Sequence, residues 1–131
     1  MEKDFDNWNE LKKLINQREN FPTFRQGEIW WTHIGLNVGF ESDGKNEKYH
    51  RPVLIIKKFN KQLFLAVPLT TQIKVNPYYY KISFEKNKIE RCAILSQIKM
   101  LDAKRLDRKI GKMTPKEFGV LRSKVSEMIG K

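Results

Sequence analysis

Cysteine and long apolar runs are scarce in this chain. Cys92 is the only cysteine among 131 residues, so no disulfide can form within the chain and a reducing compartment is expected. No apolar run approaches the roughly 18–20 residues that a membrane-spanning helix needs, and the first residues lack the pattern of a signal peptide. We therefore expect a cytoplasmic protein that does not insert into a membrane.

The residues that usually bind metals are also few. The sequence has two histidines, His33 and His50, whose positions relative to Cys92 do not follow the spacing of a zinc site. A single cysteine in an apolar segment is usually a core residue, so Cys92 is not expected to be a catalytic thiol. We predict neither a bound metal nor another cofactor.

Acidic residues are outnumbered by basic ones. The chain has 26 Lys and Arg against 15 Asp and Glu, which gives a net charge of +11. Residues 1–20 hold four basic and five acidic side chains, so their net charge is −1 and the remainder carries +12. A basic surplus in the body of the domain indicates a polyanionic partner: nucleic acid, an anionic membrane or an acidic protein.

An amphipathic helix is predicted at each end of the chain. Over residues 5–17 the apolar residues at helical spacing are Phe5, Trp8, Leu11, Leu14 and Ile15. Near the other end, Thr114 to Glu117 form a capping box with Pro115 at the first helical position. The residues expected to be buried in the helix that follows are Phe118, Leu121, Val125, Met128 and Ile129.

Between these helices the sequence has short β-branched and aromatic segments separated by turns. Strands are expected over residues 28–34, 53–59, 63–67, 78–84, 89–95 and 97–101. Residues 35–50 are expected to form a long loop. The predicted fold is mainly β with flanking helices: a small SH3-like antiparallel barrel over residues 23–131, preceded by a helical extension over residues 1–22.

Three motifs follow one another through the barrel domain. The first consists of Gly-Glu-Ile-Trp-Trp at 27–31, Val-Gly-Phe-Glu at 38–41 and His-Arg-Pro-Val-Leu-Ile-Ile at 50–56. The second is Val-Pro-Leu-Thr-Thr-Gln at 67–72. The third consists of Ala-Ile-Leu-Ser-Gln-Ile-Lys at 93–99, Leu-Asp-Ala-Lys-Arg-Leu at 101–106 and Ile-Gly-Lys at 110–112. In this order and with these gaps they resemble the MazF/PemK toxin family, from about residue 26 onward. The resemblance implies a PemK-type barrel.

The resemblance also implies a function and partners. Such toxins are sequence-specific endoribonucleases that cleave single-stranded RNA without a metal, by attack of the 2′-hydroxyl to leave a 2′,3′-cyclic phosphate. They belong to type II toxin-antitoxin modules and form homodimers. The cognate antitoxin has an acidic, largely disordered tail, which fits a domain of charge +12.

Two residues match the catalytic pair of the family. Arg51 suits the stabilisation of charge on phosphorus, because a guanidinium stays charged and can hold two phosphate oxygens. The Thr70 hydroxyl can orient the phosphate or donate a hydrogen bond to it, but it is not a strong base. By the same resemblance, RNA binding is expected of Gly39, Thr71, Gln72, Lys74, Gln97 and Lys99.

The general base stays open between His50 and Glu41. Histidine is the side chain whose ordinary pKa lies near neutrality, although alternation along a strand argues against a face shared by His50 and Arg51. Glu41 qualifies if the long loop folds it into the RNA groove. Of the aromatic groups Trp30–Trp31 and Tyr78–Tyr80, alternation predicts about half in the core and half available for stacking on bases.

Two other functions remain open. A non-catalytic nucleic-acid-binding barrel would explain the charge and the aromatic residues, and it would bind RNA without cleaving it. A toxin of the same fold that inhibits gyrase, as the related CcdB-type toxins do, would leave RNA intact. The presence of Arg51 and Thr70 in their motifs favours the nuclease.

Overall fold

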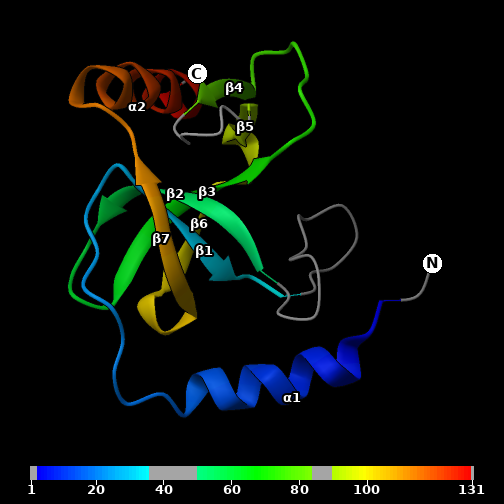
Figure 1. The fold of residues 1–131 in the computed structure, drawn as a ribbon. Coiled ribbons are helices and arrows are strands. Elements are labelled where there is room, and N and C mark those ends of the chain that lie inside the picture. Colours follow the sequence, from blue (N-terminus) through cyan, green and yellow to red (C-terminus); the bar gives the residue numbers. More distant parts are fainter. Residues whose placement is uncertain (1–2, 36–49, 84–89, 131) are drawn as a thin grey trace.

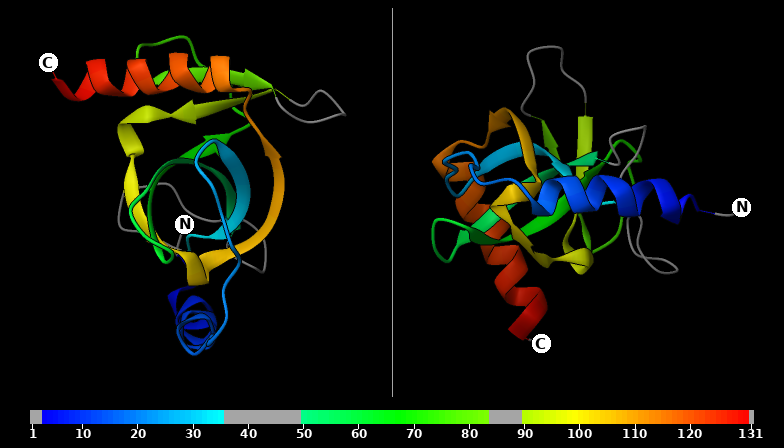
Figure 2. Two further views of the ribbon diagram at one scale, coloured as in Figure 1. Left: turned by 90° about the vertical axis from the view of Figure 1, so that its left-hand side faces the viewer. Right: turned by 90° about the horizontal axis from the view of Figure 1, so that it is seen from below.

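Antiparallel strands form the body of the computed structural model, which describes residues 3–35, 50–83 and 90–130. The elements are α1 (Phe5–Asn16), β1 (Glu28–His33), β2 (His50–Lys58), β3 (Leu63–Thr70), β4 (Tyr79–Ser83), β5 (Glu90–Ile94), η1 (Leu95–Gln97), β6 (Lys99–Asp102), η2 (Ala103–Arg105), β7 (Leu106–Lys112) and α2 (Pro115–Gly130). The strand order is β4-β5-β3-β2-β1-β7, and β6 also pairs with β3. The sheet curls into a small barrel with α1 and α2 on opposite sides (Figure 1, Figure 2). The predicted mainly β antiparallel fold with flanking helices is confirmed.

The strands β2 and β3 are buried on both faces, which explains their nearly continuous apolar sequences. Val53 and Ile55 belong to a core formed by the barrel strands, whereas Leu54 and Ile56 belong to a second core that includes Leu121 of α2. A slip of one residue would exchange the side chains that belong to the two cores. The register of this strand pair is therefore tightly specified.

The structure corrects three expectations about the strands. β7 is not among the predicted strands, because its sequence is mostly charged and its only fully buried residue is Leu106; it forms by pairing with β1. β2 begins at His50 rather than Val53, because residues 50–52 pair with β1. His50 therefore belongs to a strand and not to the predicted loop. The predicted strand at 97–101 begins only at Lys99, after the short helix η1.

Each helix buries a narrower stripe than its sequence predicts. Phe5 and Leu14 of α1 and Ile129 of α2 are exposed, because each helix contacts the barrel along part of one side only. The side chain of Asp4 caps α1 by accepting a hydrogen bond from the Asn7 amide at 3.2 Å. Among the described residues, no helix is long and apolar enough to cross a membrane.

Specific contacts fasten α1 to the barrel. The Trp8 indole is buried and packs against Gly35, where a Cβ atom would overlap the ring and where φ is +73°. Glycine is therefore required at this position on two grounds. After the helix, Arg18 Nη1 donates hydrogen bonds to the carbonyl oxygens of Lys104 and Leu106 at 2.7 and 2.8 Å. The helix is thus joined to β1 and to the start of β7.

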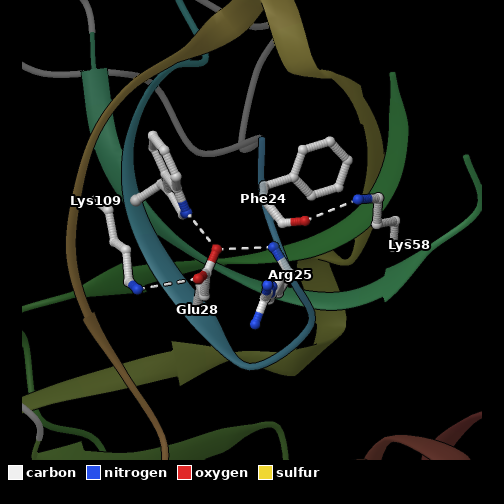
Figure 3. Close-up of polar contacts among 6 residues, drawn as sticks. Phe24, Arg25, Glu28, Lys58 and Lys109 are labelled. Atoms are coloured by element: carbon white, nitrogen blue, oxygen red, sulfur yellow. Dashed lines mark hydrogen bonds and ion pairs between the residues drawn. The ribbon is translucent and has the colours of Figure 1, made fainter. Parts of the chain in front are cut away.

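A buried carboxylate joins β1 to β7. Glu28 is 8% exposed and accepts hydrogen bonds from the Arg25 amide at 2.7 Å and from Trp30 Nε1 at 3.1 Å. Its second oxygen pairs with Lys109 Nζ at 3.0 Å (Figure 3). Burial alone would raise the pKa of Glu28, but the hydrogen bond from Lys109 and those from Arg25 and Trp30 together hold the pKa below its ordinary value. Glu28 is therefore a charged structural residue.

We predict that Glu28→Gln destabilises the fold by roughly 1–3 kcal/mol at pH 7, because buried donors lose a charged acceptor. Since the pKa of Glu28 is lowered in the folded protein, its stabilisation is present above the ordinary pKa of 4.5 and is lost as the pH falls below it. Urea unfolding of both proteins at several pH values measures the difference. Glu90→Gln is the control, because Glu90 forms an exposed pair with Lys81 that contributes about 0–1 kcal/mol. An equal effect of both substitutions at pH 7 would contradict the structural role of Glu28.

Candidate functional site

Several strands end or begin at one end of the sheet. β1 ends at His33, β2 begins at His50 and β3 ends at Thr70. A cavity of about 260 Å³ lies there, and its lining residues are Trp31, His50, Arg51, Pro52, Leu69, Thr70, Thr71 and Arg91. We call it the strand-end cavity. Four of the predicted site residues, from motifs that are distant in the sequence, therefore line one space.

The register of β2 and β3 brings Arg51 and Thr70 together. The last register pair of these two strands is Val53 with Pro68. Arg51 on β2 and Thr70 on β3 each lie two residues beyond this pair, at the same end of it, and both line the cavity. The guanidinium of Arg51 donates a hydrogen bond from Nη1 to the carbonyl oxygen of Leu69 at 3.2 Å. This bond holds the Arg51 side chain across β3, beside Thr70.

Thr70 combines a buried position with a polar function. Its side chain is 6% exposed, and its Oγ1 accepts a hydrogen bond from the Gln72 amide at 3.2 Å. This contact turns the chain as it leaves β3 and fixes the position of the hydroxyl oxygen. The hydroxyl can still donate its own proton to an anion in the cavity. Thr71 is exposed at the cavity rim.

His50 lines the same cavity as Arg51, despite the alternation of side chains along β2. Its ring stacks on Trp31 with a centroid distance of 4.4 Å and also lies 5.8 Å from the ring of His33. Its Nε2 is 3.9 Å from an Asp107 carboxylate oxygen. A carboxylate next to an imidazole can help to orient the ring. The cavity thus contains a fixed group capable of proton transfer.

The sequence indicated no role for Arg91 or Asp107. Arg91 is 9% exposed and reaches the cavity from β5, and its Cζ lies 5.7 Å from the centre of the Trp31 ring. The signal that could have revealed it is a charged residue inside an otherwise apolar strand. Asp107 belongs to β7, the strand that the sequence did not predict.

Other predicted site residues lie elsewhere. Gly39 and Glu41 fall outside the described residues. Gln72 and Lys74 follow β3 and are exposed, with Lys74 Nζ 5.4 Å from the centre of the Tyr79 ring. Gln97 ends η1 and Lys99 begins β6, opposite Ala66. None of these four lines the strand-end cavity, so their contact with RNA stays a prediction.

The pair Trp30–Trp31 divides as alternation predicts, whereas Tyr78–Tyr80 does not. Trp30 is 7% exposed and belongs to the barrel core, so it is not available to an RNA base. Trp31 is half-buried and lines the cavity, where it contacts His50 and Arg91. Tyr78 is exposed and Tyr79 and Tyr80 are both half-buried, and none of the three lines the cavity.

The charges around the strand-end cavity are basic. Of the eight described residues that line it, two are arginines, one is a histidine and none is a carboxylate. Such a lining favours an anionic ligand. Within residues 3–35, 50–83 and 90–130, no group of three or more His, Cys, Asp or Glu side chains is arranged to hold a metal ion.

A second, larger cavity does not have this chemistry. It measures about 340 Å³ and is lined by Pro77, Tyr78, Lys124, Glu127 and Met128, between the start of β4 and the end of α2. Its charged groups are of opposite sign, and it contains none of the predicted site residues. The strand-end cavity is therefore the candidate site.

Comparison with protein families gives one match. A model of the family described as "PemK-like, MazF-like toxin of type II toxin-antitoxin system" matches residues 25–129. The match begins after α1; the boundary predicted at residue 22 itself stays a prediction. A comparison with curated proteins gave no match.

Solved structures share this fold at low sequence identity. MazF from Deinococcus radiodurans superposes with a TM-score of 0.63 at 17% identity, covering 86% of this chain and 100% of that one. The Mycobacterium tuberculosis toxin MazF-mt6 gives a TM-score of 0.59 at 15% identity and covers 79% and 96%. An endoribonuclease in complex with its cognate antitoxin from a mycobacterial species gives 0.56 at 16% identity and covers 83% and 95%.

Proposed function

Because the chain belongs to the family of PemK-like, MazF-like toxins of type II toxin-antitoxin systems, we propose that it is an endoribonuclease that cleaves single-stranded RNA sequence-specifically at the strand-end cavity. The observation that carries the proposal is that Arg51 and Thr70 line the same cavity, together with His50 and Arg91. RNA supplies the anionic group that such a lining favours.

The proposed reaction is an internal displacement at phosphorus. The 2′-oxygen of the ribose attacks the adjacent phosphorus, and the bond from phosphorus to the 5′-oxygen breaks. The proton of the 2′-hydroxyl goes to a base, and the departing 5′-oxygen receives a proton. The products are a 2′,3′-cyclic phosphate and a 5′-hydroxyl, and no metal or other cofactor enters this balance.

Arg51 and Thr70 act on the phosphate in this scheme. Negative charge grows on the phosphate oxygens in the transition state, and preorganised donors stabilise such charge most when they are held in place beforehand. The bond from Arg51 to the Leu69 carbonyl and the bond from the Gln72 amide to Thr70 provide that order. A guanidinium carries five N–H donors and can form two parallel hydrogen bonds to phosphate oxygens.

Proton transfer is assigned to His50, with Glu41 as the other candidate base. His50 lines the cavity, is stacked on Trp31 and has Asp107 beside it. As a neutral imidazole, His50 can take the proton from the 2′-hydroxyl. The imidazolium that forms can then donate a proton to the 5′-oxygen. Glu41 lies outside the described residues and keeps its place as an alternative.

The wider surface and the partners follow from the family. Gly39, Thr71, Gln72, Lys74, Gln97 and Lys99 are proposed to bind RNA on either side of the cleaved bond. The protein would act in the cytoplasm as a homodimer, and a cognate antitoxin with an acidic segment would cover its basic surface. An antitoxin is bound in the structure of the mycobacterial relative.

The first test concerns the products. We predict that the purified protein cuts single-stranded RNA in excess EDTA, because Arg51 and Thr70 supply the charge stabilisation that a metal would otherwise provide. The 5′ fragments should end in a 2′,3′-cyclic phosphate, and duplex RNA should resist. Mapping the ends of a defined RNA by mass spectrometry measures both. Activity that is lost on chelation and restored by magnesium would contradict the mechanism. RNA that stays intact would contradict the nuclease and favour the two other functions, a nucleic-acid-binding barrel or a gyrase inhibitor.

The second test separates chemistry from binding. Arg51→Ala should lower the single-turnover rate at saturating protein roughly 100- to 1,000-fold, because it removes a donor to the transition state. Arg51→Lys should recover little, since an ammonium cannot form two parallel hydrogen bonds. Thr70→Ala should cost less than Arg51→Ala, and Thr70→Ser should retain much of the activity.

Lys99→Ala is the control for a lost positive charge. It should weaken binding and reduce its salt dependence while the rate in the bound complex stays nearly unchanged. Circular dichroism melts verify the fold of each variant. A folded Arg51→Ala protein whose RNA complex is cleaved at the same single-turnover rate as that of the wild-type protein would contradict the proposed role of Arg51.

A further inference from the structure

The imidazole of His50 stacks on two ring side chains of β1. Its ring centre is 4.4 Å from that of Trp31 and 5.8 Å from that of His33. Trp31 and His33 are two residues apart on one strand, so they project from the same face of β1. His33 and His50 are also a register pair of β1 and β2. The place of the His50 ring therefore depends on the end of β1.

Arg105 holds the backbone at this end of β1. The register of β1 with β7 ends at Thr32, opposite Leu106. One residue beyond that pair on β1, the carbonyl oxygen of His33 accepts a hydrogen bond from Arg105 Nη1 at 3.0 Å. Arg105 is the last residue of η2, and its side chain is half-buried. A side chain thus secures β1 at the position where its register with β7 ends.

Trp8 of α1 contacts both Arg105 and the chain just after His33. The indole is 6% exposed, and the Cζ of Arg105 lies 5.9 Å from the centre of its ring. The same ring packs so closely on Gly35 that a Cβ atom there would overlap it. A guanidinium is attracted to an aromatic face. One buried side chain of α1 therefore supports the end of β1 at two points.

The charge of Arg105 makes the indole necessary to this arrangement. Burial lowers the pKa of Arg105, and the nearby negative charge of Asp102 opposes this shift. If the indole is removed, water gains access to the guanidinium, and hydration competes with the hydrogen bond to the His33 carbonyl. Trp8 therefore favours the conformation in which Arg105 stays bonded to β1.

We propose that Trp8 and Arg105 are positioning residues that hold the His50 imidazole in the strand-end cavity through the end of β1. Neither is among the described residues that line that cavity, so both act through His33 and Trp31. The consequence for catalysis rests on the proposed function, because it takes His50 to be the group that transfers protons. The proposal gives a role to α1, which precedes the part of the chain that matches the family.

The first test observes the His50 ring directly and needs no cleavage. The chain has two histidines, so a carbon–proton NMR spectrum of the imidazole rings contains two sets of signals, and His33→Gln assigns them by removing one set. The ring current of Trp31 displaces the His50 signals from those of a free imidazole. We expect Trp8→Ala and Arg105→Gln each to move the His50 signals toward the values of a free imidazole.

Phe5→Ala is the matched control. Phe5 is the other aromatic residue of α1, and it is 48% exposed. This variant should leave the His50 signals at their wild-type values. Signals that stay at wild-type values in both Trp8→Ala and Arg105→Gln would overturn the proposal, and so would equal displacements in Phe5→Ala and Trp8→Ala.

Two variants of Arg105 keep the test decisive if Trp8→Ala does not fold. Arg105→Gln leaves the indole in place on Gly35 and removes only the guanidinium. Arg105→Lys should displace the His50 signals less than Arg105→Gln does, because lysine keeps a charged donor for the carbonyl oxygen of His33. Equal displacements in these two variants would overturn the role of the hydrogen bond.

The second test measures the consequence for catalysis. Trp8→Ala should lower the single-turnover rate at saturating protein roughly tenfold, because a misplaced imidazole transfers protons less efficiently. Its affinity for an RNA with 2′-O-methyl sugars throughout, which cannot be cleaved, should stay near the wild-type value. A lower melting temperature combined with wild-type His50 signals and a wild-type bound rate would make Trp8 a residue of stability alone and overturn the proposal.

The two proposals fail separately. Displaced His50 signals in the variants of a protein that never cleaves RNA would support the positioning role and contradict the nuclease. Cleavage by the wild-type protein, together with His50 signals that neither Trp8→Ala nor Arg105→Gln displaces, would support the nuclease and contradict the positioning role.

Discussion

The burial of β2 and β3 on both faces is the constraint on which the site depends. Because Val53 and Ile55 face one core while Leu54 and Ile56 face the other, a slip of one residue would move each of these side chains into the core in which it does not pack. That register, which ends at the Val53–Pro68 pair, brings Arg51 and Thr70 to the same cavity at the strand ends. The polar residues of the site therefore take their positions from apolar packing some residues away.

Charged side chains are held by different kinds of contact at the site and in the rest of the barrel. Glu28 is a buried charge with three donors, and it serves to join β1 and β7. At the strand-end cavity, Arg51 and Arg91 are instead held by a carbonyl oxygen and an aromatic ring. These two contacts help to hold the guanidinium groups at the cavity that they line. A site that stabilises a phosphate by charge needs this arrangement, because reorienting donors during the reaction would cost free energy.

How much was predictable from the sequence depends on the range of the interactions involved. The strands with apolar sequences and the capped helices were predictable, because hydrophobic periodicity and caps are local signals. β7 was not, since Leu106 is its only fully buried residue and its pairing with β1 arises from tertiary structure. Arg51 and Thr70 were found through motifs. Arg91 reaches the cavity, and Asp107 reaches His50, only through the pairing of strands that are distant in sequence. Glu41 and Gly39 lie outside the described residues.

The central claim is that the reacting phosphate binds between Arg51 and Thr70. A crystal structure with an RNA that has a 2′-deoxy sugar at the cleaved nucleotide tests it most directly, because the phosphate stays intact. The account predicts oxygens of that phosphate within hydrogen-bond distance of the Arg51 guanidinium and of Thr70 Oγ1, about 2.7–3.2 Å. RNA bound along another surface of the protein, with the strand-end cavity unoccupied, would contradict it.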